Sequence, residues 1–429
     1  MALILHITPH MGGGVGKALS GLVGQATQSS PGFEHRIICL ESPQKSQFVQ
    51  KAIDVGCKLT CCPSASELFE AIEQADIVQL EFWNHPAMLR ALCSGPLPAM
   101  RLLIWCHVSG LYYPSIPSRL LTEAHQFLFT SPCSFEAIEV RNLEPSVRDR
   151  LGVVSSGGGF DTLPLPRSMS REELKVGYIG SLNFAKLHPE VVTFLAAVRM
   201  PEFCLRLIGD ETNKVVLEKQ CRLLGRPNLL EFRGYTTDIA TELGDLDILV
   251  YLLNPKHYGT AENALLEAMA MGIVPIVLDN PAERYIVDNF QTGLVVHSPE
   301  ELADTVDWLT THRDEQLAMG QRAAIKVREG YTYKQIDSAF NSYYCNLMRQ
   351  SKFFVEFNDI FGYEPADWFR AFYRNSVVFS DNGTVHVPLD QSCYALLERT
   401  KGSVFHFLDY FPSDARLKDW ATNFEMSFS

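Results

Sequence analysis

The chain has 429 residues, of which 46% are hydrophobic and 20% are charged, and its formal net charge is −13 at pH 7. This balance is typical of a folded globular protein with room for two ordinary domains and an additional segment. The excess of acidic residues, with no run of Lys and Arg to offset it, argues against a general nucleic-acid-binding protein.

The cysteines and the apolar runs bear on the cellular compartment. The 11 cysteines are scattered without a C-x-x-C pair, which argues against a zinc or redox site. The apolar run at residues 2–7 is too short for a signal peptide, and no apolar stretch approaches the length of a membrane span. We therefore expect a cytoplasmic protein with reduced thiols.

Two series of apolar runs alternate with helical patterns along the chain. Each series predicts a parallel sheet covered by helices on both faces, and a proline-containing segment at 162–171 predicts a linker between them. The two α/β halves suggest an enzyme with a cleft. The expected strands are residues 2–7, 35–40, 76–80, 101–106, 127–130 and 152–155 in the first half, and 175–179, 203–208, 229–232, 247–253, 273–278 and 293–297 in the second.

A glycine run, Met11-Gly-Gly-Gly-Val-Gly-Lys17, follows the first expected strand. It is not a P-loop, because Met11 stands at the first glycine of that motif and Ala18 replaces its Ser or Thr. Lys17 also breaks the dinucleotide-binding spacing. The run is either a tight turn into a helix or, around Gly14, a place where backbone amides approach a phosphate or substrate.

Two polar residues follow expected strands. His107 comes at the end of the strand at 101–106, and Lys186 lies six positions after Gly180, which follows the strand at 175–179. The carboxyl ends of parallel strands are the usual ligand-binding edge of an open α/β sheet. A lone histidine is nevertheless more often structural than catalytic, and a loop lysine is usually only solvated.

The stretch from His257 to Asn280 predicts a helix between two buried strands. Thr260 is the expected N-cap, Ala261 to Met271 the helix and Gly272 its stop. Glu267 is surrounded by apolar residues, so its carboxylate needs a hydrogen-bonding partner. Ligand hydroxyls, an Arg elsewhere in the chain or an exposed edge would each satisfy it. Glu262 lies in the first turn, where acids also occur simply to complement the helix dipole.

The run Ala264-Leu-Leu-Glu-Ala-Met-Ala-Met-Gly272 resembles the signature of the family-4-type retaining glycosyltransferases of the GT-B fold (glycosyl transferases group 1). Their pattern has two glutamates eight positions apart. Glu267 matches the second, which in the family holds the donor's ribose hydroxyls. Gly259 stands at the position of the first, so Glu262 is a candidate substitute that would orient the sugar.

The resemblance extends to other residues. It implies that Lys186 binds the donor diphosphate, while Ser181 stands where the family usually has an Arg. It also implies that His107 contacts the donor sugar. The expected helix N-terminus at Thr260, Ala261 and Asn263 would add positive potential at the leaving group, which makes a metal ion unnecessary.

The last 80 or so residues do not continue the alternation of strand and helix patterns, and they contain many aromatic side chains. Residues 377–387 predict a hairpin that turns at Asn382-Gly383. We expect a small α+β module that packs its aromatic face on the catalytic body or on another subunit. It would serve acceptor recognition or assembly, or it would be a purely stabilising cap.

The sequence therefore predicts a GT-B α/β protein. Its expected parts are an acceptor-side domain at 1–165, a donor-side domain at 172–350 and an aromatic extension at 351–429. It would move a sugar from a nucleotide-diphosphate-sugar to a glycan, lipid or protein hydroxyl with retention of configuration and without a cofactor. A non-catalytic nucleotide-sugar or glycan binder and a sugar-nucleotide epimerase remain alternatives, and a homo-oligomer is possible. The expected catalytic residues are Lys186, His107 and Glu262, and the expected donor-binding residues are Glu267, Gly180, Ser181, Thr260, Ala261, Asn263 and Gly14.

Overall fold

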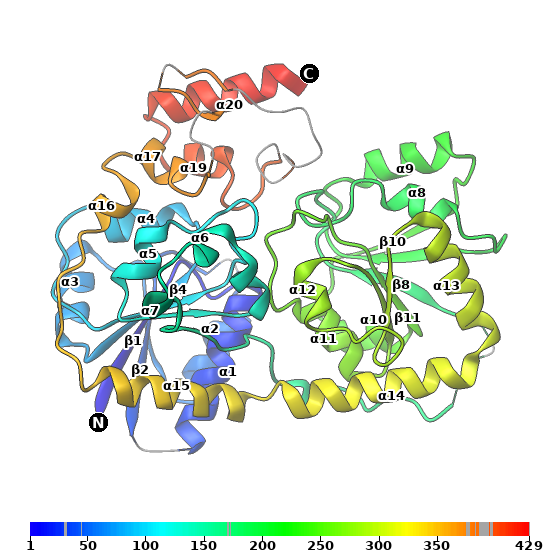
Figure 1. The fold of residues 1–429 in the computed structure, drawn as a ribbon, viewed down its shortest axis with the longest axis horizontal. Helices are drawn as coiled ribbons and strands as arrows, with labels where there is room; N and C mark the ends of the chain where they lie inside the picture. Colours follow the sequence, from blue (N-terminus) through cyan, green and yellow to red (C-terminus); the bar gives the residue numbers. More distant parts are fainter. Residues whose placement is uncertain are drawn as a thin grey trace. The chain divides into compact units, whose positions relative to one another are not determined.

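The computed structural model describes the chain except positions 30–31, 44, 170, 172, 375–377, 382, 386–393, 395–397 and 429. The chain forms two compact units (Figure 1). The first unit comprises Met1–Gly158, Tyr258–Thr260 and Tyr333–Ser429, and the second comprises Gly159–His257 and Ala261–Thr332.

The first unit is built on a seven-stranded parallel sheet with the order β3-β2-β1-β4-β5-β6-β7. Each of the six runs expected in this half forms a strand. The seventh strand, β3, was not predicted, because its side chains are exposed or only half-buried and form no apolar run. The strands are β1 Ala2–Thr8, β2 Phe33–Cys39, β3 Lys58–Cys61, β4 Ile77–Phe82, β5 Leu102–Cys106, β6 Gln126–Phe129 and β7 Leu151–Val153.

Helices cover both faces of this sheet. On one face, α1 and α15 contribute Leu22 and Phe340 to a core that includes Ile4 and Trp105. The opposite face is covered by α3, α4 and the C-terminal helices. The helices are α1 Gly13–Ser29, α2 Gln47–Asp54, α3 Ala65–Gln74, α4 Pro86–Cys93, α5 Ser118–Glu123, α6 Ile138–Arg141, α7 Pro145–Arg148, α15 Tyr333–Leu347, α16 Phe357–Phe361, α17 Pro365–Arg370, α19 Val404–Tyr410 and α20 Ala415–Phe428, with a 3₁₀ turn at Pro132–Glu136.

Helix α15 belongs to the first unit, although the sequence placed it in the second domain. Phe340 and Tyr344 are fully buried against the first sheet, and the Tyr344 hydroxyl donates to Gln79 Oε1 at 2.6 Å. The apolar face of α15 therefore completes the first core.

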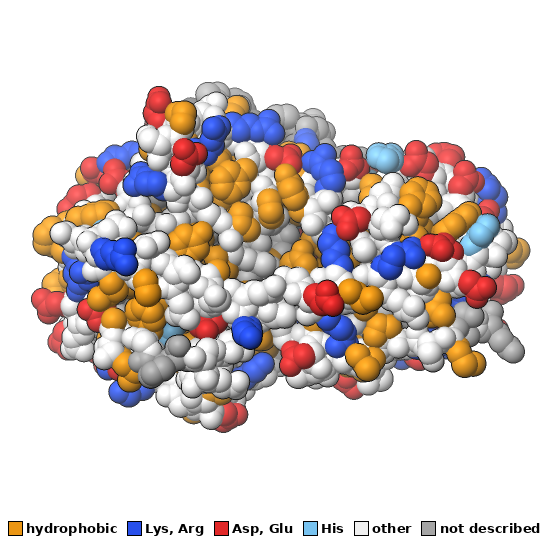
Figure 2. Space-filling view, turned by 60° about the horizontal axis from the view of Figure 1, so that its bottom comes forward, with side chains coloured by type: hydrophobic (Ala, Val, Ile, Leu, Met, Phe, Trp, Pro, Cys, Tyr) orange, Lys and Arg blue, Asp and Glu red, His pale blue; other side chains and the backbone are white. Residues whose placement is uncertain are grey.

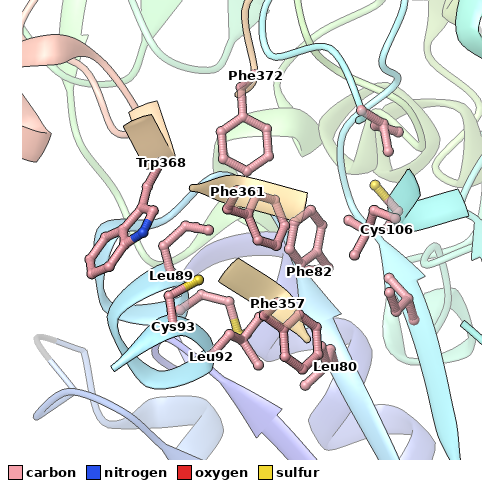
Figure 3. Packing of buried hydrophobic residues seen from close by; sticks show 14 of the residues in the cluster. Leu80, Phe82, Leu89, Leu92, Cys93, Cys106, Phe357, Phe361, Trp368 and Phe372 are labelled. Atoms are coloured by element: carbon pink, nitrogen blue, oxygen red, sulfur yellow. The ribbon is translucent and has the colours of Figure 1, made fainter. Parts of the chain in front are cut away.

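The aromatic extension shares one hydrophobic core with β4 and α4. Figure 3 shows Phe357, Phe361 and Phe372 from the extension beside Leu80 and Phe82 of β4. The extension is thus continuous with the body of the first unit instead of forming a separate module. Of the expected hairpin, Phe379 and Val385 form an antiparallel bridge and Gly383 has φ 82°, whereas 377, 382 and 386–387 lie outside the described residues.

The second unit is built on a six-stranded parallel sheet with the order β10-β9-β8-β11-β12-β13. All six expected strands are present. They are β8 Val176–Ile179, β9 Leu205–Ile208, β10 Leu230–Gly234, β11 Ile248–Tyr251, β12 Val274–Leu278 and β13 Leu294–Val296. The helices are α8 Val191–Ala196, α9 Lys214–Leu223, α10 Ile239–Gly244, α11 Asn263–Ala270, α12 Pro281–Arg284, α13 Pro299–Thr311 and α14 Arg313–Gly330, with a 3₁₀ turn at Phe160–Thr162.

The side chains show how charge is distributed on one face and whether a helix could span a membrane. Figure 2 shows a face on which acidic and basic side chains are interspersed. Within the described part of the chain, no helix is both long enough and apolar enough to cross a membrane.

Candidate functional site

The central helix of the second unit, α11, begins later than the sequence predicted. Glu262 is its N-cap and adopts a left-handed conformation, with φ 33° and ψ 65°. Thr260 is not the cap: its hydroxyl accepts a hydrogen bond from the Thr130 hydroxyl at 2.7 Å within the first unit. Asn263 is the first helical residue. Gly272, with φ 77°, follows the last turn and ends the helix as predicted.

The left-handed turn carries the Glu262 carboxylate into a buried polar network. Its Oε2 accepts a hydrogen bond from the Tyr251 hydroxyl at 2.7 Å and lies 3.0 Å from Lys186 Nζ. Burial alone would raise the pKa of Glu262, but Lys186, His257 and Tyr251 together outweigh it, and the pKa is lowered. Glu262 is therefore a buried carboxylate held in its ionised form.

The loop after β8 positions Lys186. Asn254 donates its backbone N–H to the Lys186 carbonyl at 2.7 Å, which ties the loop to the chain following β11. The Lys186 side chain is 22% exposed, so its ammonium can be reached while it contacts Glu262. Ser181 contributes its backbone, because its carbonyl accepts a hydrogen bond from the Tyr178 hydroxyl at 2.9 Å. Gly180 is required here, since a Cβ would lie 2.7 Å from that hydroxyl.

A histidine that sequence reasoning missed extends the network. His257 is buried, with Nε2 3.2 Å from Glu283 and Nδ1 3.8 Å from Glu262. Burial would lower the pKa of His257, but Glu283 and Glu262 outweigh it and the pKa is raised. His257 and Glu283 are 26 residues apart in the chain and lie on different elements, so no local sequence pattern predicts their contact.

The remaining candidates of the second unit lie on or beside α11. Glu267 is 7% exposed in the middle of this buried helix, and it has an interaction partner within the protein. Ala261 is buried, whereas Asn263 is half-buried. The Asn263 Oδ1 atom is buried and has no hydrogen-bonding partner among the described residues.

His107 belongs to the first unit, immediately after β5, and its partner is a second missed residue. Its Nε2 lies 3.0 Å from Glu81 Oε2, and His6 Nδ1 lies 3.0 Å from Glu81 Oε1. Burial would raise the pKa of Glu81, but the hydrogen bonds of His107 and His6 outweigh it and the pKa is lowered. Since an ionised carboxylate only accepts, His107 carries a hydrogen on the Nε2 atom that faces Glu81.

Behind Glu81 the hydrogen bonds continue across the sheet. The Gln79 amide donates to Glu81 Oε1 at 2.9 Å, and His6 Nε2 lies 2.8 Å from His35 Nδ1. His6 thus donates to Glu81 through Nδ1 and pairs with His35 through Nε2. Burial lowers the pKa of His35 to about 3. The network thus fixes the orientation of each ring.

The glycine run forms the start of α1. Gly14 is exposed in the first turn, and a Cβ at Gly16 would approach the Met11 carbonyl oxygen at 2.1 Å. The expected site residues therefore fall into two groups. Lys186, Glu262, Glu267, Gly180, Ser181, Ala261 and Asn263 lie in the second unit, and His107, Gly14 and Thr260 lie in the first. Among the described residues, His10, Glu41 and His85 of the first unit have ligand atoms close enough to hold a metal ion.

Comparisons with solved structures identify the fold class of the chain. The chain matches the structure of HepE from Anabaena in complex with UDP and glucose, with a TM-score of 0.64, 14% identity, and coverage of 81% of this chain and 100% of that chain. A glycosyltransferase from Rickettsia africae matches with a TM-score of 0.64, 15% identity, and coverage of 82% and 99%. Sucrose-phosphate synthase from Thermosynechococcus elongatus matches with a TM-score of 0.60, 16% identity, and coverage of 82% and 100%. The predicted GT-B fold, with two Rossmann-like domains, is confirmed.

A comparison of the sequence with protein-family models matches part of the chain. Residues 167–326 match the family model of the glycosyl transferases group 1, and no curated protein matches the chain. The predicted resemblance to this group is confirmed over residues 167–326, which lie in the second unit apart from Tyr258–Thr260.

Proposed function

We propose that the protein transfers a sugar from a nucleotide-diphosphate-sugar donor to an acceptor hydroxyl with retention of anomeric configuration. The observation that carries this proposal is the contact of Lys186 with buried Glu262 at the start of α11, inside the segment that matches the family. It places a partly exposed cation beside the N-terminus of a buried helix, where anions are favoured. HepE was crystallised with UDP-glucose, which makes a uridine nucleotide sugar the first donor to test.

Lys186 would stabilise the charge that develops on the leaving diphosphate. Glu262 is 1% exposed and already contacts Tyr251 and Lys186, so we assign it the positioning of the lysine. The sugar contact expected of Glu262 remains a prediction. Because a fixed carboxylate and hydroxyl hold the ammonium before the substrate arrives, little reorganisation accompanies the transfer.

The other candidates would orient the donor. Glu267 would hold the ribose, and the buried Oδ1 of Asn263 at the start of α11 would accept a hydrogen bond from the donor. His107, oriented by Glu81 through Nε2, would contact the donor sugar. Gly180, Ser181 and Ala261 would bring backbone groups close to the diphosphate.

Replacement of Lys186 tests the proposal. A panel of nucleotide sugars is first ranked by thermal stabilisation, since a ligand of the native state raises stability. With the best donor, we expect Lys186→Ala to lower kcat by roughly a hundredfold or more, the loss typical of one preorganised donor. Lys214→Ala, at a half-buried lysine of α9 in the same unit that contacts Glu211, is the matched control and keeps its rate. We also expect EDTA to leave turnover unchanged.

Two outcomes would replace this proposal. A protein that binds a nucleotide sugar but never turns it over would be a binder, which the Gly259 and Ser181 substitutions keep open. A donor converted to its epimer without any acceptor would indicate an epimerase. A Lys186→Ala protein with a normal kcat would remove the lysine from the chemistry.

A further inference from the structure

The second unit contains a cavity of about 170 Å³ beside the last turn of α11. Its walls are the linker at 164–167 and 169, residues 243–244 and 246–247 between α10 and β11, residues 271–273 after α11, and residues 316–317 of α14. We call it the linker cavity. The contact between Lys186 and Glu262 lies at the first turn of α11, so the linker cavity is at the opposite end of this helix.

The linker cavity has room for one small apolar molecule. Its wall includes the buried side chains of Leu243, Leu246 and Ile273. An apolar cavity of about 150 Å³ is large enough to bind benzene. Leu165 and Met169, which also line the cavity, are 75% and 76% exposed, so the apolar lining continues to the solvent-exposed surface. The expected occupant is therefore about the size of one aromatic ring.

One polar atom of the wall is buried without a partner. Gln316 lines the cavity and is 4% exposed. Its Nε2 donates to the Asp247 carbonyl at 3.3 Å, which fixes the orientation of the amide. Its Oε1 is buried and has no hydrogen-bonding partner among the residues that the structure describes. Because a buried acceptor without a donor is unfavourable, a ligand that supplies an N–H or O–H group is favoured here.

The charged groups of the wall favour a neutral ligand. Arg167 and Asp247 both line the cavity, and Arg167 Nη1 lies 3.3 Å from Asp247 Oδ1. Asp247 Oδ2 accepts the Lys175 backbone N–H at 2.9 Å and lies 4.0 Å from Arg313 Nη2. A charged ligand would have to compete with these contacts, whereas a neutral donor can pair with Gln316 and leave them intact.

The linker wall is fixed to the helices of the unit. Arg328 Nη2 on α14 donates to the Leu163 carbonyl at 2.9 Å and to the Pro164 carbonyl at 2.7 Å. Pro166 packs on Gly272, where a Cβ would lie 2.7 Å from the Pro166 Cβ. The linker is therefore held against α11 and α14, and the cavity between them has a defined shape.

We propose that the linker cavity binds a small neutral molecule that has an apolar body the size of one aromatic ring and one N–H or O–H group. The apolar body contacts Leu243, Leu246 and Ile273, and the N–H or O–H group donates to Gln316 Oε1. This site is distinct from the proposed donor site, because the two lie at opposite ends of α11. It also does not depend on the proposed function.

Phenol and toluene test the site in the full-length protein, since the two molecules have similar size and differ by one hydroxyl donor. We expect both to shift the methyl NMR signals of Met169 and Met271, which line the cavity. The signal of Met88, which is buried in the first unit, should not move. This titration of the parent protein tests the cavity without any substitution.

Gln316→Met then tests the hydrogen bond, because methionine has a similar size and lacks the acceptor. We expect the ratio of phenol affinity to toluene affinity to fall roughly five- to tenfold, the change that corresponds to one ordinary hydrogen bond. Toluene should still bind the variant, which shows that the cavity is intact. Gln291→Met, at an exposed glutamine of the same unit, is the matched control and should keep the parent ratio.

Three results would overturn the proposal. The first is a parent protein in which neither phenol nor toluene shifts Met169 or Met271. The second is an equal affinity ratio in Gln316→Met and the parent protein, because the hydroxyl would then not pair with Gln316. The third is loss of phenol binding in Lys186→Ala, which would place phenol at the other end of α11. Each result is independent of turnover and of the nucleotide-sugar panel.

Discussion

At the scale of single residues, Glu81 determines which nitrogen His107 presents. Its carboxylate accepts from both His107 and His6, so each ring keeps its hydrogen on the nitrogen that faces Glu81. A glutamine at this position has one oxygen and one NH₂ group, and it can accept from only one of the two rings in the same way. The other ring must change its tautomer.

We expect Glu81→Gln to lower kcat/KM by roughly 10- to 100-fold, the usual cost of removing a group that orients a functional histidine. The decisive measurement is the tautomer of His107 by nitrogen NMR, because a purely structural role for Glu81 would leave it unchanged in the folded variant. Glu34→Gln, on β2 near the surface, is the control. An unchanged tautomer together with normal kinetics would contradict the positioning role.

The sequence revealed some of these residues and not others, for a physical reason. Lys186 and Glu262 follow recognisable strand and helix signals, although nothing local predicts their 3.0 Å contact. Glu81 looks like an ordinary strand residue, and only the fold brings His6 and His107 to it from neighbouring strands. Polar networks built across a sheet leave no periodic signal along the chain.

At the scale of elements, buried strands were the most predictable feature, because each is a continuous apolar run. The start of α11 was less predictable. Thr260 has the chemistry of an N-cap, but the left-handed turn at Glu262 delays the helix, and a residue other than glycine is uncommon in that conformation. Contacts of the Glu262 carboxylate with Lys186 and Tyr251 stabilise a turn that local preference disfavours.

The loop that carries Lys186 depends on a close backbone approach. A Cβ at Gly209, directly after β9, would lie 2.0 Å from the Gly180 carbonyl oxygen, so the Gly180 backbone would have to move. We expect Gly209→Ala to destabilise the second unit by about 1–3 kcal/mol, the usual cost of overpacking. Donor affinity should also fall, because the displaced loop holds Lys186.

Gly244→Ala is the matched control for Gly209→Ala. Its Cβ would meet only Met271 Cε at 3.8 Å, an ordinary van der Waals contact. Denaturant unfolding and donor titration of the two variants separate the effects. Equal stability and donor affinity in Gly209→Ala and the parent protein would show that the loop after β8 tolerates the shift.

At the scale of the whole molecule, composition predicted that the extension packs an aromatic face on the catalytic body or on another subunit, but not which elements it packs on. Aromatic density indicated a buried face, yet nothing in the sequence specified that the face belongs to β4 and α4. Phe361 is 1% exposed and shares its core cluster with Phe82, Leu89 and Leu92. This continuity favours the stabilising role among the alternatives.

We therefore expect removal of residues 351–429 to cause aggregation, because it would uncover the apolar side chains of β4 and α4. A single substitution in the extension tests the same packing without removing the segment. Phe361→Ala should destabilise the first unit by about 3–5 kcal/mol, the usual cost of truncating a buried aromatic side chain. Tyr363→Ala should have little effect, since Tyr363 is 73% exposed. A soluble, cooperatively folded truncated protein would contradict this prediction.

The stability of the first unit should also depend on pH through its buried histidines. Burial lowers the pKa of His10, His35, His85 and His406 to between about 2 and about 4, from the ordinary histidine value of 6.5. Between pH 6.5 and pH 4 the unfolded chain therefore binds protons that the folded chain does not. Stability present above pH 6.5 is lost as the pH falls through this window. His257, whose pKa is raised, opposes the trend below pH 6.5 but is only one residue.

His85→Asn isolates one of these contributions. His85 caps α4 by accepting the Ala87 N–H, and asparagine is a favourable N-cap that can do the same without titrating. Glu81 and Glu262, whose pKa values are lowered, are present in both proteins, so their contributions cancel in the comparison. Denaturant unfolding at pH 7.5 and pH 5 should show the parent protein losing on the order of 2 kcal/mol more than the variant. An equal loss in the two proteins would mean that His85 is protonated in the folded state, and its Nδ1 could then not accept the Ala87 N–H.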